Sequence, residues 1–244
     1  MRPARGRVEL KYSVPEGVAV RVLDIARTFL DPEQYAEGGR QRVTSLYLET
    51  PSLTFLRWHK ARAADRFKLR VRRYGDHSAS VLFAELKRKT NDLVHKRRAR
   101  FPVEVLDAVI DGARLSHMPL APGDEGDMAE FIRQRLVFGA RPSVLITCVR
   151  ESWRGSKTEP ENAVTVDREL TCQPADRADV IGGGTWSPIR LPRQSRRDDV
   201  LLELKYGTQP AAWMTPLIAR LAPSRVSFSK YVAAMSLLRP WETC

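Results

Sequence analysis

The stretch Arg66-Phe-Lys-Leu-Arg-Val-Arg72 decides the fold class, because its residues alternate strictly between basic and apolar. Positions 66, 68, 70 and 72 are basic, whereas Phe67, Leu69 and Val71 are apolar. Successive side chains of a β-strand point to opposite faces of the sheet, so the alternation predicts a strand with one basic and one apolar face. The apolar face needs cover from other elements, which leaves the basic face either solvated or enclosed.

Charged rows of the same kind recur along the chain. They join Glu85 with Lys87 and Lys89, Lys96 with Arg98 and Arg100, Glu9 with Lys11, and Glu203 with Lys205. Neighbours on one face of a strand lie about 7 Å apart. A like-charged pair at that distance costs about 2 kcal/mol at an effective dielectric of 20. Several such rows that face one another are therefore unfavourable unless an anion lies between them.

A basic row can also be the wet face of a half-buried sheet, which is a common arrangement. Solvated faces usually mix Ser, Thr, Gln and both charges, whereas these rows are strongly basic with a few isolated glutamates. Closing the sheet into a barrel encloses the charged face and removes the sheet edges. We therefore expect an α+β, mainly antiparallel β protein: an eight-stranded closed tunnel barrel with peripheral helices and a basic lumen that binds phosphate.

The remaining pattern gives the order of the elements. Strands are predicted over residues 7–13, 42–49, 66–74, 80–88, 94–101, 143–152, 163–169 and 200–206. Helices are predicted over residues 18–30, 103–110, 127–138, 210–221 and 228–238. A long loop is expected between positions 173 and 199, where glycine, proline and arginine gather. Because no linker separates two parts, a single domain over residues 1–244 is expected.

The charge balance favours a polyanionic partner. The 244 residues include 41 Lys+Arg and 29 Asp+Glu, a formal net charge of +12, which suits nucleic acid, an anionic membrane or phosphate-rich small molecules. The odd, widely spaced Cys148, Cys172 and Cys244 indicate neither a disulfide framework nor a metal site. There is no apolar signal-peptide core and no apolar run of the roughly 18–20 residues that span a bilayer. A soluble, cytoplasmic protein is expected.

Taken in order, several short motifs resemble the VTC domain, the polyphosphate-polymerase branch of the triphosphate tunnel metalloenzymes in the CYTH-like superfamily. The motifs are Glu9-Leu-Lys-Tyr12, Ser45-Leu-Tyr-Leu-Glu-Thr-Pro51, Lys68-Leu-Arg-Val-Arg72, Glu85-Leu-Lys-Arg-Lys89, Lys96-Arg97-Arg98, Arg150, Thr165-Val-Asp167, Leu202-Glu-Leu-Lys205 and Phe228-Ser-Lys-Tyr231. Each motif alone is weak. In this order and spacing they are specific, and they cover nearly the whole chain.

The resemblance implies a tunnel of eight antiparallel strands in which basic side chains bind a triphosphate or polyphosphate. The implied catalytic phosphate ligands are Lys11, Arg70, Arg72, Lys87, Arg98, Arg150 and Lys230. Further substrate-binding cations are Lys68, Lys89, Lys96 and Lys205. Glu203 is the implied metal ligand, with Glu9 and Glu85 as metal-side or lysine-orienting carboxylates. The expected cofactor is Mn²⁺ or Mg²⁺, since Mg²⁺ binds through one or two carboxylates plus substrate oxygens.

The activity that the resemblance implies is an ATP-dependent polyphosphate polymerase, which transfers the γ-phosphate of ATP to a growing polyphosphate chain. Phosphoryl transfer asks a protein mainly for positioning and charge neutralisation, which basic rows supply. The chain departs from the family pattern at Ala163, where the polymerases usually carry an arginine. The alternatives are a metal-dependent triphosphatase or short-polyphosphate hydrolase, a non-catalytic polyphosphate-binding subunit, and a nucleic-acid binder. The expected partners are ATP and polyphosphate or triphosphate, without nucleic acid and without a transmembrane segment.

Overall fold

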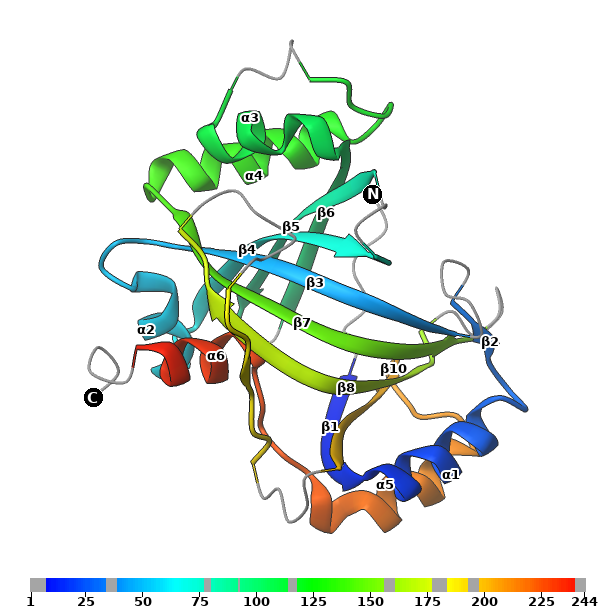
Figure 1. Ribbon diagram of the computed structural model, residues 1–244. Helices are drawn as coiled ribbons and strands as arrows, with labels where there is room; N and C mark the ends of the chain where they lie inside the picture. Colours follow the sequence, from blue (N-terminus) through cyan, green and yellow to red (C-terminus); the bar gives the residue numbers. More distant parts are fainter. Residues whose placement is uncertain are drawn as a thin grey trace. The chain divides into compact units, whose positions relative to one another are not determined.

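The computed structural model describes residues 8–33, 39–76, 80–91, 93–113, 118–155, 161–176, 184–192 and 198–239. In this part of the chain a mostly antiparallel sheet is combined with six α-helices (Figure 1), so the α+β class is confirmed. The strands are β1 (Val8–Pro15), β2 (Asp31–Pro32), β3 (Arg40–Glu49), β4 (Asp65–Tyr74), β5 (Val81–Thr90), β6 (Leu93–Pro102), β7 (Arg141–Arg154), β8 (Ala163–Pro174), β9 (Ser187–Pro188) and β10 (Asp199–Tyr206). The helices are α1 (Glu16–Ala26), α2 (Thr54–Lys60), α3 (Leu106–Asp111), α4 (Glu125–Val137), α5 (Met214–Leu221) and α6 (Lys230–Leu238).

The basic and apolar alternation in β4 produces the two faces that the sequence predicts. Phe67, Leu69 and Val71 are buried in an apolar core. Arg70 and Arg72 point to the other face, where both donate to hydroxyl groups of the neighbouring strand β3. Each of the eight predicted strands is present, and each buries apolar residues, although in β6 only Ala99 and Phe101 are buried.

The strand order is open rather than closed. Hydrogen-bonded neighbours follow the order β1-β10-β8-β7-β3-β4-β5-β6, with β2 on β7 and β9 on β8. The prediction of a closed barrel is therefore wrong for the described residues, because β1 and β6 are the two ends of this order.

Side chains and an irregular segment cover the two end strands in place of another strand. At β6, the backbone N–H groups of Arg98 and Arg100 donate to the carboxylates of Asp127 and Asp124, each at 3.0 Å. At β1, the carbonyl of Lys11 accepts the N–H of Val226 at 2.8 Å. Backbone groups that are buried or lie at a sheet edge need hydrogen-bond partners. Because β1 and β6 have such partners, these edges do not need to pair with a further strand.

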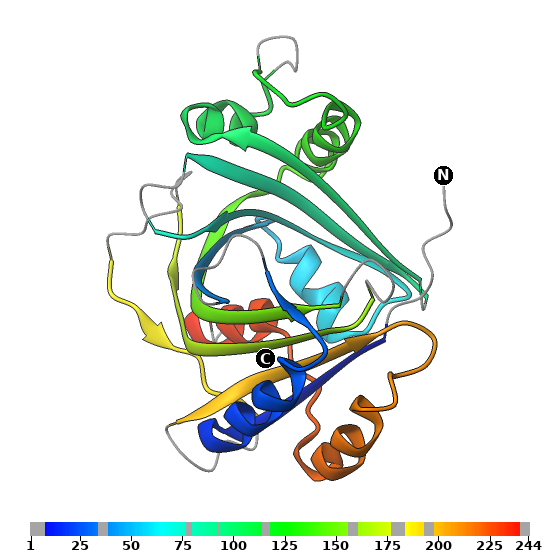
Figure 2. The same cartoon turned by 90° about the vertical axis from the view of Figure 1, so that its right-hand side faces the viewer.

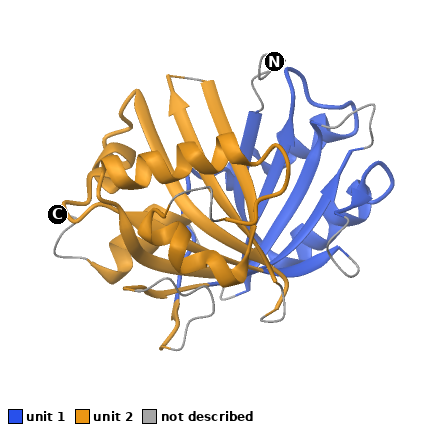
Figure 3. Ribbon diagram, turned by 90° about the horizontal axis from the view of Figure 1, so that it is seen from above, with its two compact units in different colours: residues 1–42, 148–170, 188–229 blue, residues 43–147, 171–187, 230–244 orange. Residues whose placement is uncertain are grey.

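The chain divides into two compact units, each built from separate stretches of sequence (Figure 3). Unit 1 comprises residues 1–42, 148–170 and 188–229, and unit 2 comprises residues 43–147, 171–187 and 230–244. Three of the strands, β3, β7 and β8, continue from one unit into the other. Each unit has its own apolar core.

In unit 1, α1 and α5 lie beside each other against β1 and β10 (Figures 1 and 2). The helix α1 begins after Pro15, which cannot continue a helix toward the N-terminus. Its buried face carries Ala19, Val22, Leu23 and Ala26, the spacing of one helical stripe. The antiparallel register places Lys11 opposite Glu203 and Glu9 opposite Lys205. This register determines which charged residues meet in unit 1.

In unit 2, β3, β4, β5 and β6 are consecutive antiparallel neighbours, and α3 and α4 lie next to β5 and β6 (Figures 1 and 2). Their apolar faces share a core that includes Leu82, Phe101 and Phe131. The register sets Arg70 opposite Glu85, and Glu85 opposite Arg98. One acidic residue is thereby flanked by basic residues on both neighbouring strands.

The helix α2 was not predicted from the sequence. It has only seven residues, too few for helical periodicity to be visible. Its N-terminus is held by the buried carboxylate of Glu49, which accepts the backbone N–H groups of Phe55 at 3.1 Å and Leu56 at 2.8 Å. A carboxylate that satisfies free N–H groups stabilises a helix start.

The other helices agree with the predicted segments apart from their ends. The helix α5 begins at Met214 rather than at Pro210, which places Pro216 in its first turn, where proline is tolerated. Within the described residues, no helix combines the length and the apolar character that crossing a bilayer requires.

Candidate functional site

The densest group of charges in unit 2 surrounds the carboxylate of Glu85. We call it the Glu85 cluster; its members are Ser45, Tyr47, Arg70, Arg72, Tyr74, Glu85, Lys96 and Arg98. The Glu85 carboxylate lies 2.6 Å from Arg70 Nη2 and 2.7 Å from Lys96 Nζ. The Arg98 and Arg72 guanidinium groups follow at 3.6 and 3.7 Å. Four positive charges therefore surround one negative charge.

The electrostatics of the cluster follow from this excess of cations. Although burial opposes its ionisation, Arg70, Arg72 and Lys96 hold the pKa of Glu85 well below its usual range. Burial lowers the pKa of Lys96 to about 8, even though Glu85 favours its charged form. Glu85 thus stays ionised and orients its cations, and its oxygens are already engaged by positive groups. This surrounding fits a carboxylate that positions cations better than a metal ligand.

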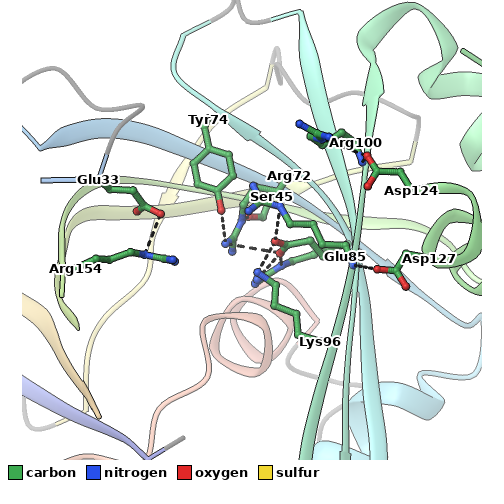
Figure 4. Close-up of polar contacts among 12 residues, drawn as sticks. Glu33, Ser45, Arg72, Tyr74, Glu85, Lys96, Arg100, Asp124, Asp127 and Arg154 are labelled. Carbon is green, nitrogen blue, oxygen red and sulfur yellow. Dashed lines mark hydrogen bonds and ion pairs between the residues drawn. The ribbon is translucent and has the colours of Figure 1, made fainter. Parts of the chain in front are cut away.

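Three hydroxyl groups accept hydrogen bonds from the arginines of the Glu85 cluster. Arg70 Nη1 donates to Tyr47 Oη at 2.9 Å. Arg72 Nε donates to Ser45 Oγ at 3.1 Å, and Arg72 Nη1 donates to Tyr74 Oη at 3.3 Å (Figure 4). Burial raises the pKa of Tyr47 and Tyr74, but the neighbouring arginines outweigh burial and leave both pKa values below the usual range. The guanidinium groups are therefore fixed by neutral acceptors as well as by Glu85.

The predicted lysines of unit 2 lie in a row across three strands. Lys68 is opposite Lys87, and Lys87 is opposite Lys96. Two residues further along the same two strands, β4 and β5, Arg66 is opposite Lys89. The Lys68 ammonium lies 5.4 Å from the ring centroid of Tyr231 in α6. Of this row, Lys96 joins the Glu85 cluster.

Lys230 is the first residue of α6. Its charge helps to lower the pKa of Tyr47, after burial and the larger effects of Arg70 and Arg72. The next residue, Tyr231, donates its hydroxyl to Glu49 and stacks on Tyr47 with 5.2 Å between ring centroids. The predicted phosphate ligand Lys230 is thus held close to the Glu85 cluster by its neighbour in the sequence.

A second group of charges lies in unit 1 around Glu203. We call it the Glu203 cluster; its members are Glu9, Lys11, Thr165, Glu203 and Lys205. Lys11 Nζ lies 3.0 Å from Glu9 Oε1 and 3.8 Å from Glu203 Oε1, and it donates to the carbonyl of Phe228 at 3.0 Å. Lys205 Nζ lies 2.7 Å from Glu203 Oε2. The two Glu-x-Lys pairs that the sequence shows at opposite ends of the chain are therefore cross-strand neighbours.

Burial and the carboxylates act in opposite directions on the two lysines of the Glu203 cluster. Burial opposes the charge of Lys11, but Glu203 and Glu9 outweigh it and raise its pKa. For Lys205 burial dominates and lowers the pKa, despite the attraction of Glu203. Thr165 Oγ1 donates to Glu203 Oε2 at 3.3 Å, which fixes the second oxygen of that carboxylate.

Arg150 forms a two-pronged ion pair with Asp167 beside the Glu203 cluster. Arg150 Nε lies 2.7 Å from Asp167 Oδ1, and Nη2 lies 2.9 Å from Oδ2. Burial opposes the charge of Arg150, but Asp167 outweighs it and raises the pKa. Ala163, which stands where family polymerases usually carry arginine, is buried and lies opposite Lys205 in the register.

The carboxylates of unit 1 fit a divalent metal in their chemistry. Glu9 and Glu203 both contact Lys11, and Mg²⁺ is bound in phosphate-handling sites through one or two carboxylates together with phosphate oxygens. In the described part of the chain, no group of three or more His, Cys, Asp or Glu side chains gathers in a way that could hold a metal ion. A metal at this position would therefore need ligands from the substrate.

The structure brings most of the predicted residues into the two clusters. Arg70, Arg72, Lys96, Arg98 and Glu85 meet in unit 2. Lys11, Lys205, Glu9 and Glu203 meet in unit 1, with Arg150 beside them.

Five neighbours of the charges are not among the predicted site residues: Tyr47, Ser45, Tyr74, Thr165 and Asp167. The signal for the first two was present, since Ser45, Tyr47 and Glu49 alternate along one strand face. Asp167 belongs to the motif Thr165-Val-Asp167, and its pairing with Arg150 depends on the contact between β7 and β8.

The sequence model of the VTC domain family matches residues 6–239, so the resemblance to this family is confirmed. Among solved structures, a candidate adenylate cyclase from Bacillus halodurans is similar with a TM-score of 0.50 and 13% identity, over 92% of this chain and 95% of that chain. A protein from Pyrococcus horikoshii OT3 has a TM-score of 0.39 and 10% identity, over 89% of this chain and 86% of that chain. At these identities the likeness to the first structure shows the fold alone. Among curated proteins, no sequence matches this chain.

Proposed function

Because the chain belongs to the VTC domain family, we propose that it is an ATP-dependent polyphosphate polymerase, which transfers the γ-phosphate of ATP to a growing polyphosphate chain. The observation that carries this proposal is the Glu85 cluster, where four cations surround one carboxylate. The three excess positive charges, four minus one, match a polyanion. A chain of phosphates supplies closely spaced negative oxygens of this kind.

The cations of the Glu85 cluster are suited to positioning phosphates. Arginine offers a planar fork that binds two oxygens, whereas lysine acts as a point charge. Arg70 and Arg72 are two residues apart on β4 and share its polar face, and both guanidinium groups approach Glu85 Oε2. Glu85 and the hydroxyl groups hold the forks in place before a substrate arrives. Such preorganised charge lowers the barrier of phosphoryl transfer.

The metal in this proposal is Mg²⁺ or Mn²⁺, held by Glu203 with Glu9 and by phosphate oxygens. When bound, the metal neutralises charge on the phosphate oxygens as the phosphoryl group is transferred. Lys11 lies between the two carboxylates and keeps them from repelling each other while they are free. These carboxylates support an enzyme over a subunit that only binds polyphosphate, since binding a polyanion needs no acidic groups.

One observation favours a second candidate, the hydrolysis of triphosphate or short polyphosphate. Ala163 replaces a cation that family polymerases usually carry, and its cross-strand neighbour is Lys205. With one cation fewer, a long phosphate chain is held by fewer contacts, while a triphosphate still reaches the remaining ones. Water then replaces the phosphate chain as the acceptor.

Calorimetry with tripolyphosphate tests whether the Glu85 cluster binds phosphate. Arg72 is buried and hydrogen-bonded in the cluster, so Arg72→Ala is expected to weaken binding. A hydrogen bond to a charged group contributes roughly 1.5–3 kcal/mol, which corresponds to a loss of about tenfold to a hundredfold. The matched control is Arg220→Ala, which removes the same charge from the exposed side of α5. Equal losses in the two variants would show a diffuse electrostatic attraction and overturn the proposed site.

A further inference from the structure

Two buried hydroxyl groups of β3 are part of the Glu85 cluster and carry no charge. Ser45 and Tyr47 are two residues apart, so they share one face of the strand. Both are 5% exposed. In the register, Ser45 lies opposite Arg72 and Tyr47 lies opposite Arg70, and each hydroxyl oxygen accepts a hydrogen bond from its opposite arginine.

The hydrogen bonds around these hydroxyl groups leave two protons without an acceptor. A hydroxyl group has one O–H to donate besides its acceptor lone pairs. Ser45 and Tyr47 each use a lone pair for an arginine N–H, and no acceptor for either O–H is found among the described residues. Buried hydroxyl groups usually use their hydrogen-bonding capacity, and these two O–H groups are available to an acceptor that a ligand supplies.

The nearby carboxylates of the chain are already engaged. Glu85 faces four cations. Glu49 accepts the hydroxyl of Tyr231 and the N–H groups of Thr50, Phe55 and Leu56. Among the described residues, these two carboxylates thus leave the two O–H groups to an anionic ligand.

The charges around Tyr47 favour an anionic acceptor. Burial raises the pKa of this phenol, but Arg70, Arg72 and Lys230 outweigh burial and lower it. The ring itself is held by stacking on Tyr231, with 5.2 Å between centroids. The three cations attract an anion to the neighbourhood of the Tyr47 hydroxyl. The neutral O–H then donates a directed hydrogen bond to this anion, in addition to the attraction by the cations.

We propose that Tyr47 and Ser45 are substrate-contacting residues, which donate O–H hydrogen bonds to the phosphate oxygens that Arg70 and Arg72 attract. This inference rests on the proposed function and extends its site from cations to neutral donors. The cations supply most of the attraction, and the two hydroxyl groups fix where the phosphate oxygens lie along β3. A chain of phosphates held at fixed positions meets the geometric demand of phosphoryl transfer.

The test is calorimetry with tripolyphosphate at several salt concentrations on wild type, Tyr47→Phe and Ser45→Ala. Tyr47→Phe keeps the ring that stacks on Tyr231 and removes only the hydroxyl group. We expect affinity to fall about tenfold in Tyr47→Phe, the effect of one hydrogen bond to a charged group, and by a smaller factor in Ser45→Ala. Tyr206→Phe is the matched control, because no arginine contact is found for Tyr206 in the described structure, and it should bind as wild type does.

Salt dependence separates a neutral donor from an effect through the arginines. Removing a neutral hydroxyl group leaves the number of charges unchanged, so the dependence of affinity on salt should be the same in Tyr47→Phe as in wild type. Loss of a cation flattens that dependence, as Arg70→Ala should show, because fewer screened charges take part. A flattened dependence in Tyr47→Phe would show that the hydroxyl acts by holding Arg70, and it would overturn the inference.

The remaining outcomes are equally decisive. If wild type binds tripolyphosphate and both hydroxyl variants bind equally well, the inference is wrong while the proposed function stands. If wild type does not bind tripolyphosphate, the proposed function and the inference both fail. A loss confined to Ser45→Ala and Tyr47→Phe, with unchanged salt dependence and with Tyr206→Phe unaffected, supports the inference.

Discussion

Replacing Glu85 by glutamine should destabilise the folded chain and at the same time improve its binding of tripolyphosphate. The carboxylate is 1% exposed and faces four cations at 2.6 to 3.7 Å. Glutamine keeps the size of the side chain and removes the charge. The four cations then repel one another without compensation, and a polyanion relieves that repulsion.

The structure sets the size of the effect. Coulomb's law gives roughly 6 kcal/mol for each of the two shortest contacts at an effective dielectric of about 20, and desolvation of the buried groups offsets most of it. Removing one partner of a buried ion pair costs about 3–5 kcal/mol in measured cases. We therefore expect Glu85→Gln to lose about 3–5 kcal/mol of unfolding free energy near neutral pH.

The pH dependence of this loss has a definite sign. The pKa of Glu85 is lowered in the folded chain, so its contribution to stability is present above the unfolded pKa, about 4.3, and is lost as the pH falls toward the folded pKa. The difference between wild type and Glu85→Gln should be constant between about pH 5 and 7 and should shrink below about pH 4.5.

Urea unfolding followed by circular dichroism measures the difference, with and without tripolyphosphate. The matched control is Glu130→Gln: Glu130 forms an i,i+3 pair with Arg133 near the surface of α4, and such pairs contribute about 0.2–1 kcal/mol. The shift of the midpoint by tripolyphosphate should be larger in Glu85→Gln than in wild type. Equal stability of Glu85→Gln and Glu130→Gln, or a smaller shift by tripolyphosphate, would refute the electrostatic account of the cluster.

Two further changes test other buried carboxylates. Asp167→Asn leaves Arg150 with a neutral partner in place of its two-pronged ion pair, so unfolding free energy should fall by about 1.5–3 kcal/mol in urea titrations, and an unchanged midpoint would contradict this reading. Burial raises the pKa of Glu49 in the folded chain, despite its hydrogen bonds with Tyr231 and Thr50. Glu49 in its protonated form therefore contributes to the stability of the folded chain. This contribution is present below the unfolded pKa and is lost as the pH rises. The stability of wild type relative to Glu49→Gln should therefore decline from pH 4 to pH 7, and a difference that does not depend on pH would speak against it.

The strands could be predicted from the sequence because their two faces differ so sharply. The alternation in β4 runs from Arg66 to Arg72, and burial of Leu69 and Val71 follows from it directly. In β8 the prediction ended at Glu169, while the strand continues to Pro174. Glu169 has a φ of 52°, which interrupts the regular pleat. Beyond Glu169 the alternation continues with Leu170, Thr171 and Cys172, so the predicted strand ended too early.

The open order of the strands could not be predicted from the alternation. An edge strand and an interior strand show the same two faces, and what differs is where the backbone N–H groups donate. In β6 they donate to Asp124 and Asp127, which the sequence places near the start of a helix. Only the packing of α4 against β6 shows that these carboxylates take the place of a strand.

The charged site residues could be predicted, and their partners could not. Lys11 and Glu203 are 192 positions apart, and the register of β1 with β10 brings them opposite each other. The basic residues stand out because lysine and arginine are rarely buried. Tyr47 does not stand out, since a tyrosine in a strand usually contributes to a core, and its role near Arg70 becomes visible only from the direction of one hydrogen bond.

The measurement that tests the proposed function most directly is ³¹P NMR of the purified chain incubated with ATP and Mn²⁺ or Mg²⁺. The account predicts that the γ-phosphate signal of ATP falls while ADP and the internal phosphates of a growing polyphosphate appear. It predicts no such change for Glu203→Gln, which lacks the proposed metal ligand. Release of orthophosphate alone would contradict the polymerase and favour the hydrolase, and unchanged ATP with wild type under both metals would contradict a catalytic role.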